Sequence, residues 1–179
     1  MDNLILNFSS RREGNCYHLA RLAGKMLPGE TEIVDFCDLD VRPCGKCGYE
    51  CFRGGACPLA EDGIPSVYEK IAAAGQVIFI APNYCGYPCG NFFAFNERGC
   101  SYFGGRRDRL EQFLSVPKRF IVVSNSESHH FSEAFGYLAR EKEPRMLYLG
   151  TRKYGLTSFQ GNLAEAPGVE DAVKQFLLG

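Results

Sequence analysis

One unbroken apolar run, residues 77–81 with the sequence VIFIA, constrains the fold of this chain more than any other stretch. A strand that faces water on one side alternates apolar and polar residues. A continuous run of β-branched and aromatic residues is instead typical of a strand that helices cover on both faces. We therefore expect the central strand of a parallel sheet at this position.

The chain changes character directly after this run. Residues 82–90, PNYCGYPCG, contain two prolines, two glycines, two tyrosines and two cysteines. Prolines fix φ, and glycines permit tight turns and close backbone approach. Because ligands of open parallel sheets bind beyond the carboxyl ends of central strands, this loop is a candidate site for a bound ring system. An ordinary connecting loop is the alternative.

The other apolar segments alternate between strand-like and helix-like periods, which predicts a doubly wound α/β fold with a parallel sheet. The expected strands are residues 3–8, 32–36, 76–81, 119–124 and 145–149, and the expected helices are residues 15–27, 64–74, 106–114, 130–142 and 169–177. The 179 residues fit one domain. Two long connections, residues 85–106 and 150–167, are expected to be functional or to contribute to an interface.

Composition disfavours two classes of partner. Lysine and arginine number 20 against 21 acidic residues, so the chain lacks the positive balance that grips nucleic-acid backbones. No run approaches the roughly 18 apolar residues of a membrane span. The first ten residues lack the basic start and apolar core of a signal peptide. We therefore expect a cytoplasmic protein that binds neither nucleic acid nor membrane.

A short polar and basic turn follows the first expected strand. Residues 9–15, SSRREGN, lead into a helix for which Asn15 is the expected N-cap. Free backbone N–H groups and the positive end of a helix favour an anion at such a turn. The sequence has neither GxxxxGK[ST] nor GxGxxG, so a single terminal phosphate fits this turn better than a nucleoside triphosphate or a dinucleotide.

Nine cysteines are many for a protein of a reducing compartment, where structural disulfides are rare. Cys44, Cys47, Cys51 and Cys57 form a C-x2-C-x3-C-x5-C run with Pro58 directly after it. Four thiolates this close favour an iron–sulfur cluster over a structural zinc ion, whose ligand pairs usually lie further apart. Unligated thiols are the remaining alternative.

Three stretches together resemble the NADPH-dependent FMN reductase family, and specifically its iron–sulfur flavoprotein branch. Residues 8–16, FSSRREGNC, resemble the family turn G-S-x-R-x-x-G-N-T, with phenylalanine and cysteine in place of its first and last residues. Residues 82–90 resemble a P-V-Y loop with small residues, and residues 93–98, FAFNER, resemble K-x-F-x-D-R. The cysteine run lies where the branch keeps its cluster ligands, although the branch typically has x2 where this chain has x3.

The resemblance implies a flavodoxin-like three-layer sandwich with a five-stranded parallel sheet in the order 2-1-3-4-5. It implies one FMN-binding domain over residues 1–179 with a cysteine-rich insertion at 37–58. The residues implied to bind FMN are Ser9, Arg11, Asn15, Cys16, Pro82, Asn83, Tyr84, Cys85, Gly86, Tyr87, Cys89 and Gly90. The implied ligands of a [4Fe–4S] cluster are Cys44, Cys47, Cys51 and Cys57. No residue is assigned as a catalytic acid or base.

The expected activity is that of an FMN-dependent oxidoreductase that takes electrons from NAD(P)H or another reduced donor. Its acceptor would be a small molecule or a redox protein. The alternative is a non-catalytic electron carrier or redox sensor whose cysteine segment is metal-free or holds zinc. A homodimer or homotetramer is expected, because related proteins bring the cluster close to a flavin of a neighbouring subunit.

Several further residues have two interpretations. Cys85 and Cys89 form a redox pair or, as we favour, are small side chains that line the loop. Cys16 lies in the first turn of a helix, where it is either a reactive thiol of lowered pKa or a contact of the phosphate. His129 and His130 approach the ring or, as we favour, are solvated residues that open a helix. The aromatic residues crowded around Arg98 are expected to form a subunit interface, with a lid over the flavin as the alternative; they are Phe92, Phe93, Phe95, Tyr102 and Phe103.

Overall fold

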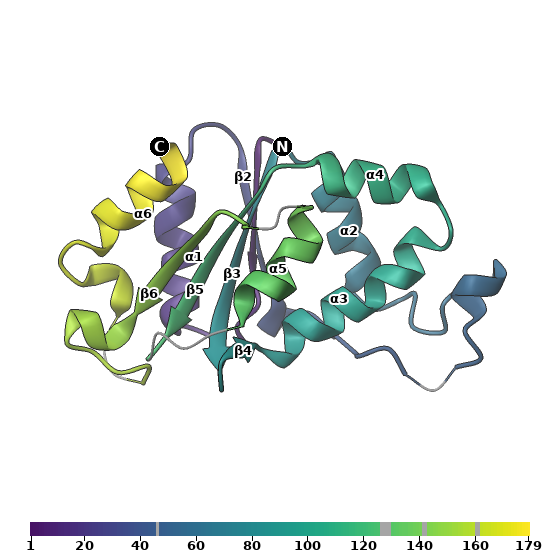
Figure 1. Ribbon diagram of the computed structural model, residues 1–179, viewed down its shortest axis with the longest axis horizontal. Helices are drawn as coiled ribbons and strands as arrows, with labels where there is room; N and C mark the ends of the chain where they lie inside the picture. The colour runs from purple at the N-terminus through teal and green to yellow at the C-terminus, as the bar shows by residue number, and fades with distance from the viewer. Residues whose placement is uncertain (46, 126–129, 141–142, 160–161) are drawn as a thin grey trace.

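A parallel sheet lies between two layers of helices (Figure 1). The computed structural model describes residues 1–45, 47–125, 130–140, 143–159 and 162–179. Its five parallel strands are ordered β2-β1-β3-β5-β6. They are β1 (Asn3–Asn7), β2 (Thr31–Asp35), β3 (Gln76–Tyr84), β5 (Lys118–Ser124) and β6 (Met146–Gly150). This is the predicted flavodoxin-like order 2-1-3-4-5, and the order reverses between β1 and β3.

The sheet differs from the prediction by one short strand. β4 (Tyr87–Pro88) pairs antiparallel with the end of β3, with Asn83 opposite Pro88 and Tyr84 opposite Tyr87. The loop predicted after residue 81 is therefore partly a β-hairpin. Its many prolines and glycines concealed the hairpin, because they are rare within strands.

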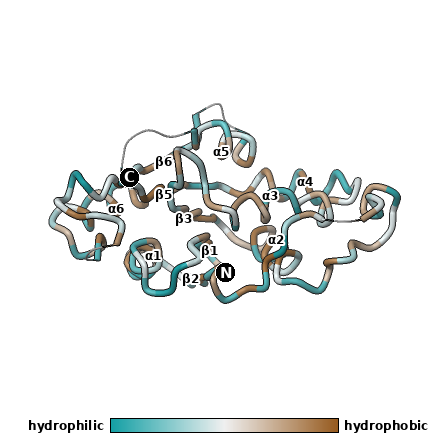
Figure 2. Tube along the Cα trace, turned by 90° about the horizontal axis from the view of Figure 1, so that it is seen from below, coloured by the Kyte–Doolittle hydropathy of each residue, from teal (hydrophilic) through white to brown (hydrophobic). Residues whose placement is uncertain are grey.

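The helices cover both faces of the sheet, as the unbroken apolar run predicted. Along β3, Val77, Phe79 and Ala81 pack on one face, whereas Ile78 and Ile80 pack on the other. The first face is covered by α2 (Ile64–Ala73), α3 (Gly90–Phe103), α4 (Arg107–Ser115) and α5 (Phe131–Ala139). The second face is covered by α1 (Asn15–Met26) and α6 (Val169–Leu178). Figure 2 shows the hydrophobic residues concentrated between these layers.

The long connection predicted at residues 85–106 is largely helix α3. Its aromatic residues belong mostly to the core, which corrects the prediction of an exposed interface patch or lid. Phe92 and Phe95 are completely buried, Tyr102 is nearly so, and only Phe93 is exposed. The apolar spacing of residues 92, 95, 99 and 102 is that of a helix with one buried face, and the density of aromatic residues obscured this period.

The segment between β2 and α2 projects from the body beyond α3 (Figure 1). Its described regular structure consists of two short 3-10 helices, η1 (Phe36–Asp38) and η2 (Glu50–Arg53). The second long connection, between β6 and α6, contains η3 (Thr151–Tyr154) and η4 (Leu163–Glu165). Among the described residues, no helix has the length and apolar character needed to cross a membrane.

Candidate functional site

A cavity of about 250 Å³ opens at the carboxyl ends of β1, β3 and β5, where the strand order reverses. Open α/β sheets bind ligands at this kind of position. Three turns and part of the β6–α6 connection contribute its walls. The lining residues are Ser9, Arg11, Gly14, Asn15, Cys16, Pro82, Asn83, Tyr84, Cys85, Val123, Ser124, Asn125, Ser158 and Phe159. We call this space the flavin cavity, after the cofactor that the sequence leads us to expect there.

The turn after β1 presents donors and positive charge to the flavin cavity. Buried Ser9 accepts a hydrogen bond from the backbone N–H of Arg11 at 3.1 Å, which closes the turn. Within the described chain, no side chain caps the N-terminus of α1, and its first turn contains no acidic residue. The first N–H groups of α1 and the Arg11 guanidinium therefore form a positive wall suited to an anion.

Phe8 shows how the chain accommodates a large side chain where the family motif has glycine. Its ring is completely buried and lies 4.2 Å from the Phe36 ring and 5.5 Å from the Phe95 ring, centroid to centroid. The side chain thus packs in the core rather than in the flavin cavity. The turn keeps its path because the Phe8 N–H donates to the carbonyl of Ile80 in the neighbouring strand.

Asn15 and Cys16 differ from their expected local roles. The N-cap of α1 is Gly14, and Asn15 is the first helical residue. Asn15 Oδ1 instead accepts a hydrogen bond from the Leu163 N–H at 3.0 Å, so this side chain joins α1 to η4. Cys16 is buried in the core of the second face, and this burial raises the pKa of its thiol, contrary to the expectation of a lowered pKa.

The β3–β4 hairpin forms the wall opposite α1. Cys85 and Gly86 have φ of 55° and 91° and join Tyr84 to Tyr87 as a two-residue turn. Positive φ at both central residues is the signature of a type I′ turn, which glycine favours. Tyr84 and Tyr87 are about half exposed at this tip, and the Tyr87 ring stacks on the His130 ring at 4.9 Å.

Asn83 fixes the hairpin to the rest of the sheet. Its Nδ2 donates to Ser124 Oγ at 3.0 Å and to the Tyr148 hydroxyl at 3.1 Å. Its Oδ1 accepts the Gly86 N–H at 2.8 Å. Because both ends of this carboxamide are engaged, Asn83 positions the loop in this structure.

The structure brings eight of the twelve predicted flavin-binding residues to the cavity wall. Gly86 and Tyr87 lie at the hairpin tip instead. Cys89 is buried, with its Sγ 3.1 Å from the Phe8 carbonyl oxygen, and burial raises the pKa of its thiol. Gly90 is the first residue of α3, and a Cβ there would meet no atom within 4 Å. The structure records Cys85 and Cys89 as free thiols.

One wall of the flavin cavity was not predicted from the sequence. Asn125 makes two hydrogen bonds to Ser158. Its Nδ2 donates to Ser158 Oγ at 2.9 Å, and its Oδ1 accepts the Ser158 N–H at 2.8 Å. Asn125 directly follows β5, and a polar residue at a strand's carboxyl end was a usable signal. Ser158 and Phe159 had none, because they reach the cavity only through this long-range pairing. His130 is exposed and does not line the cavity, and His129 lies outside the described residues.

A second cavity, of about 350 Å³, lies between the projecting segment and α3, and we call it the cysteine cavity. All four predicted cluster ligands line it, and Cys100 of α3, which had no signal in the sequence, joins them. Burial and the neighbouring Cys47 and Cys51 raise the pKa of Cys44. In the described ranges, no three histidine, cysteine or acidic side chains are placed to hold a metal ion. The cysteines thus share a cavity without forming a closed metal site.

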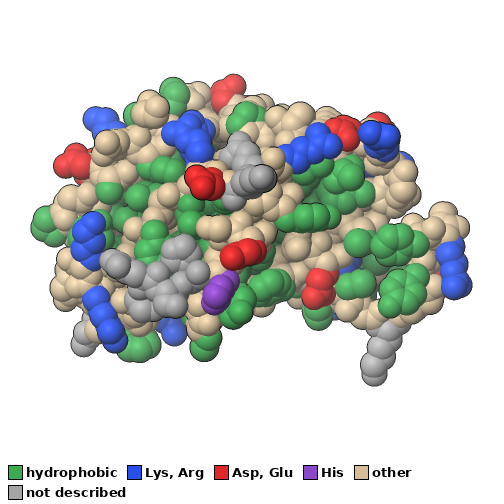
Figure 3. Space-filling view, in the orientation of Figure 1, with side chains coloured by type: hydrophobic (Ala, Val, Ile, Leu, Met, Phe, Trp, Pro, Cys, Tyr) green, Lys and Arg blue, Asp and Glu red, His purple; other side chains and the backbone are tan. Residues whose placement is uncertain are grey.

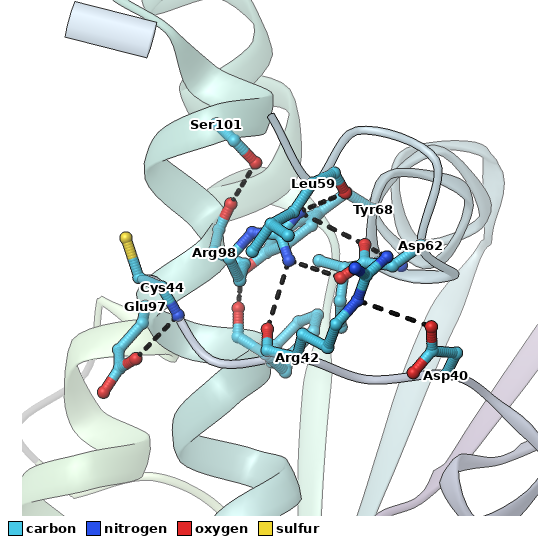
Figure 4. A network of polar contacts seen from close by, with 11 residues as sticks. Asp40, Arg42, Cys44, Leu59, Asp62, Tyr68, Glu97, Arg98 and Ser101 are labelled. Carbon is cyan, nitrogen blue, oxygen red and sulfur yellow. Dashed lines mark hydrogen bonds and ion pairs between the residues drawn. The ribbon is translucent and has the colours of Figure 1, made fainter. Parts of the chain in front are cut away.

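A buried ion pair attaches the projecting segment to the body (Figure 4). Arg98 of α3 pairs with Asp62, and both side chains are almost completely buried. The same guanidinium donates to the carbonyl oxygens of Arg42 at 3.1 Å and Leu59 at 2.8 Å. Arg98 therefore holds both ends of the segment that carries the cysteines.

Comparisons with known proteins agree with this geometry. The family model for NADPH-dependent FMN reductase matches residues 1–129 of the 179. The comparison with curated proteins finds no match.

Three similar solved structures show the fold. RosB with a bound flavin-derived intermediate is 17% identical, with a TM-score of 0.67 over 100% of this chain and 77% of that one. The Trp repressor binding protein of Bacillus subtilis is 15% identical, with a TM-score of 0.65 over 98% and 97%. An FMN-dependent NADH-azoreductase from Bacillus anthracis, in complex with FMN, is 10% identical, with a TM-score of 0.55 over 99% and 97%. With the family match over most of its length and a flavodoxin-like fold, the chain belongs to the NADPH-dependent FMN reductase family of flavin-dependent oxidoreductases.

Proposed function

We propose that the flavin cavity binds one FMN and that the chain uses it to move electrons from NAD(P)H to a small-molecule acceptor. The observation that carries the proposal is the meeting of two walls at the sheet's switch point. One wall consists of Ser9, Arg11 and the uncapped start of α1, and the other is the β3–β4 hairpin. A phosphate suits the first wall, and a flat ring suits the second.

The proposed roles of this chain's residues are binding and orientation. Arg11 and the N–H groups of α1 neutralise the FMN phosphate, while Ser9 shapes the turn. Pro82, Tyr84 and Cys85 contact the ring, and Asn83 holds their loop against β5 and β6. Bound FMN supplies the redox chemistry, since a flavin takes up two electrons and releases them singly or in pairs. No protein acid or base is required.

Arg11→Ala tests the phosphate site. A charge-assisted hydrogen bond contributes about 1.5–3 kcal/mol, so the FMN dissociation constant should rise about tenfold or more. Fluorescence titration of the apoprotein measures it. Arg12→Ala is the matched control, because Arg12 is an exposed neighbour that pairs with Asp38 and does not line the cavity. Equal affinities in the native protein and Arg11→Ala would remove Arg11 from the site.

Turnover separates the proposed enzyme from an electron carrier or redox sensor. Steady-state oxidation of NADH or NADPH with a quinone or ferricyanide as acceptor supports the enzyme and identifies the preferred donor. Reduction by a ferredoxin alone, without NAD(P)H turnover, supports the carrier.

The second part of the proposal is a [4Fe–4S] cluster held by Cys44, Cys47, Cys51 and Cys57. What supports it is the donor set, four thiols that line one cavity. The described thiols form no closed site, so assembly requires them to converge as the metal binds. We derive no step through the cluster. Anaerobic reconstitution followed by iron and sulfide analysis tests it: about four irons per chain, lost in Cys47→Ala, support the cluster, and their absence contradicts it.

The proposed homodimer or homotetramer now rests on the family resemblance rather than on the aromatic residues of α3. The hydrophobic core of this chain contains Phe92, Phe95 and Tyr102, so they are not available to a partner. Tyr49 and Phe52 are about two-thirds exposed on the projecting segment, where Figure 3 shows hydrophobic side chains at the surface. Light scattering of the purified protein measures the oligomeric state directly.

A further inference from the structure

A series of polar contacts leads to the turn after β1 from two residues that do not line the flavin cavity. It starts at Asp35, the last residue of β2, passes through Asn7, the last residue of β1, and reaches the turn at Ser9. The side chains of Asn7 and Asp35 and the residue Ser9 are all buried, with Asn7 completely so. Asn7 and Asp35 are not among the flavin-binding residues predicted from the sequence.

Each contact in this series has a fixed direction. The ionised Asp35 carboxylate is an acceptor only, and its Oδ1 accepts from Asn7 Nδ2 at 2.7 Å. That contact turns Asn7 Oδ1 toward the turn, where it accepts the Ser9 N–H at 3.1 Å. Ser9 Oγ in turn accepts the Arg11 N–H at 3.1 Å. The carboxylate therefore determines that the oxygen of the Asn7 carboxamide, and not its NH₂ group, points toward the turn.

Arg21 of α1 binds Asp35, the first residue in this series of contacts. Its guanidinium is bidentate on Asp35, with Nη1 2.9 Å from Oδ1 and Nη2 on Oδ2. The same guanidinium stacks over the Tyr17 ring, 3.6 Å from the centroid. Burial opposes ionisation of Asp35, but the hydrogen bonds from Arg21 and Asn7 outweigh it and lower the carboxyl pKa. Asp35 is thus ionised at neutral pH and oriented by two partners.

We propose that Asp35 and Asn7 are positioning residues that set the turn of Ser9 and Arg11 for the flavin phosphate. This inference rests on the proposed function. Neither side chain touches the cavity; they act by fixing the Ser9 N–H and, through Ser9, the Arg11 N–H. The N–H groups of Ser9 and Arg11 are used within the turn, so they hold its shape and do not bind the phosphate themselves. Phosphate recognition needs the turn that carries the Arg11 guanidinium to be in one geometry before the ligand arrives. Loss of the contacts of Asp35 and Asn7 therefore weakens phosphate binding while the ring's wall stays intact.

The test compares FMN with riboflavin, which has the same ring and no phosphate. Two variants break the series of contacts at different links. Asp35→Asn removes the negative charge and turns one of the two oxygens into an NH₂ donor, so the bidentate pair with Arg21 cannot form. Asn7→Leu removes the link to the Ser9 N–H and leaves the Arg21–Asp35 pair in place. Glu32→Gln is the matched control, since Glu32 lies on the same strand but pairs with Lys70.

Dissociation constants of both flavins, measured by fluorescence on the apoproteins, give the decisive ratio. The riboflavin-to-FMN ratio should fall about tenfold in Asp35→Asn and Asn7→Leu and stay within about twofold of native in Glu32→Gln, with riboflavin binding little changed. An unchanged ratio overturns the inference, and so does an equal loss of both flavins, which indicates a purely structural role. Should Asp35→Asn fail to fold, Arg21→Lys, which loses the bidentate geometry but keeps the charge, should still lower the ratio. If the native chain binds neither flavin, the proposed function falls and this inference with it, an outcome distinct from an unchanged ratio.

Discussion

The flavin cavity is framed by the ends of three parallel strands, whereas the cysteine cavity is framed by one helix and a segment with little regular structure. Around the flavin cavity, Asn83 bonds to side chains of β5 and β6 across the sheet. Asn125 makes two hydrogen bonds to Ser158 in the connection between β6 and α6. Around the cysteine cavity, the Arg98–Asp62 pair provides the main buried attachment. The first site is held in shape mainly by the strand ends, and the second depends mainly on the contacts of Arg98.

Asp62→Asn should produce the largest effect, because it removes the charge that faces buried Arg98. Breaking a buried pair costs about 3–5 kcal/mol, and we expect the lower end since Arg98 keeps the carbonyls of Arg42 and Leu59. Urea unfolding measures the loss, and limited proteolysis should show faster cleavage between residues 44 and 58. Glu111→Gln, which breaks an exposed pair with Arg140, should change the stability far less, because water screens that pair. Equal small losses in both variants would mean that the segment has another anchor.

Gly86→Val should disrupt the flavin cavity while the rest of the sheet folds. A β-branched residue at a φ of 91° costs about 1–3 kcal/mol and disturbs the turn that presents Tyr84 and Cys85. We expect the variant to purify without flavin colour. Gly90→Ala is the control, because a Cβ there meets no atom within 4 Å and alanine favours a helix. A Gly86→Val protein that is fully loaded with flavin would place the ring elsewhere.

Acid should reduce the stability that Asp35 contributes beside the flavin cavity. The pKa of Asp35 is lowered in the folded chain, so its stabilisation is fully present above the unfolded pKa of about 3.9. It is lost as the pH falls through the lower pKa of the folded state. The difference in unfolding free energy between the native protein and Asp35→Asn should therefore be constant above about pH 5 and shrink below about pH 4. A difference that stays constant down to pH 2 would contradict ionisation of Asp35 as its source.

Cys85→Asn should produce the smallest effect. Cys85 has a φ of 55°, and asparagine adopts this left-handed conformation more readily than other non-glycine residues. An Asn-Gly pair is also the preferred sequence of a type I′ turn. We expect a gain of up to about 1 kcal/mol in the free energy of unfolding, with flavin retained. A loss of stability would show that the thiol makes a contact of its own.

The sequence predicted the parallel sheet and its order because each strand is apolar enough to need cover on both faces. It also predicted the two principal walls of the flavin cavity, since residues that directly follow a strand must lie at the sheet's carboxyl edge. Ser158 and Cys100 could not be predicted in this way. Each reaches its cavity through a contact between segments far apart in the sequence, and neither position has a local pattern that encodes that contact.

Local rules failed where a tertiary partner competed with them. Asn15 has the residue type of an N-cap, but Leu163 takes its oxygen. Cys16 has the position of an activated thiol, but the core buries it. The aromatic residues of α3 have the composition of an interface, but most of them pack in the core of the chain itself and only Phe93 is exposed.

Helix α3 runs from the end of the β3–β4 hairpin to the cysteine cavity, since it starts after Cys89 and carries Arg98 and Cys100. Its 14 residues span about 20 Å. The helix behaves as a rigid rod that keeps the cysteine cavity at one distance and one rotational angle from the hairpin. Inserting a single residue between Ala94 and Arg98 would turn everything beyond the insertion by about 100°, swinging Arg98 away from Asp62. The distance and the relative orientation of the two cavities thus depend on the number of residues in α3.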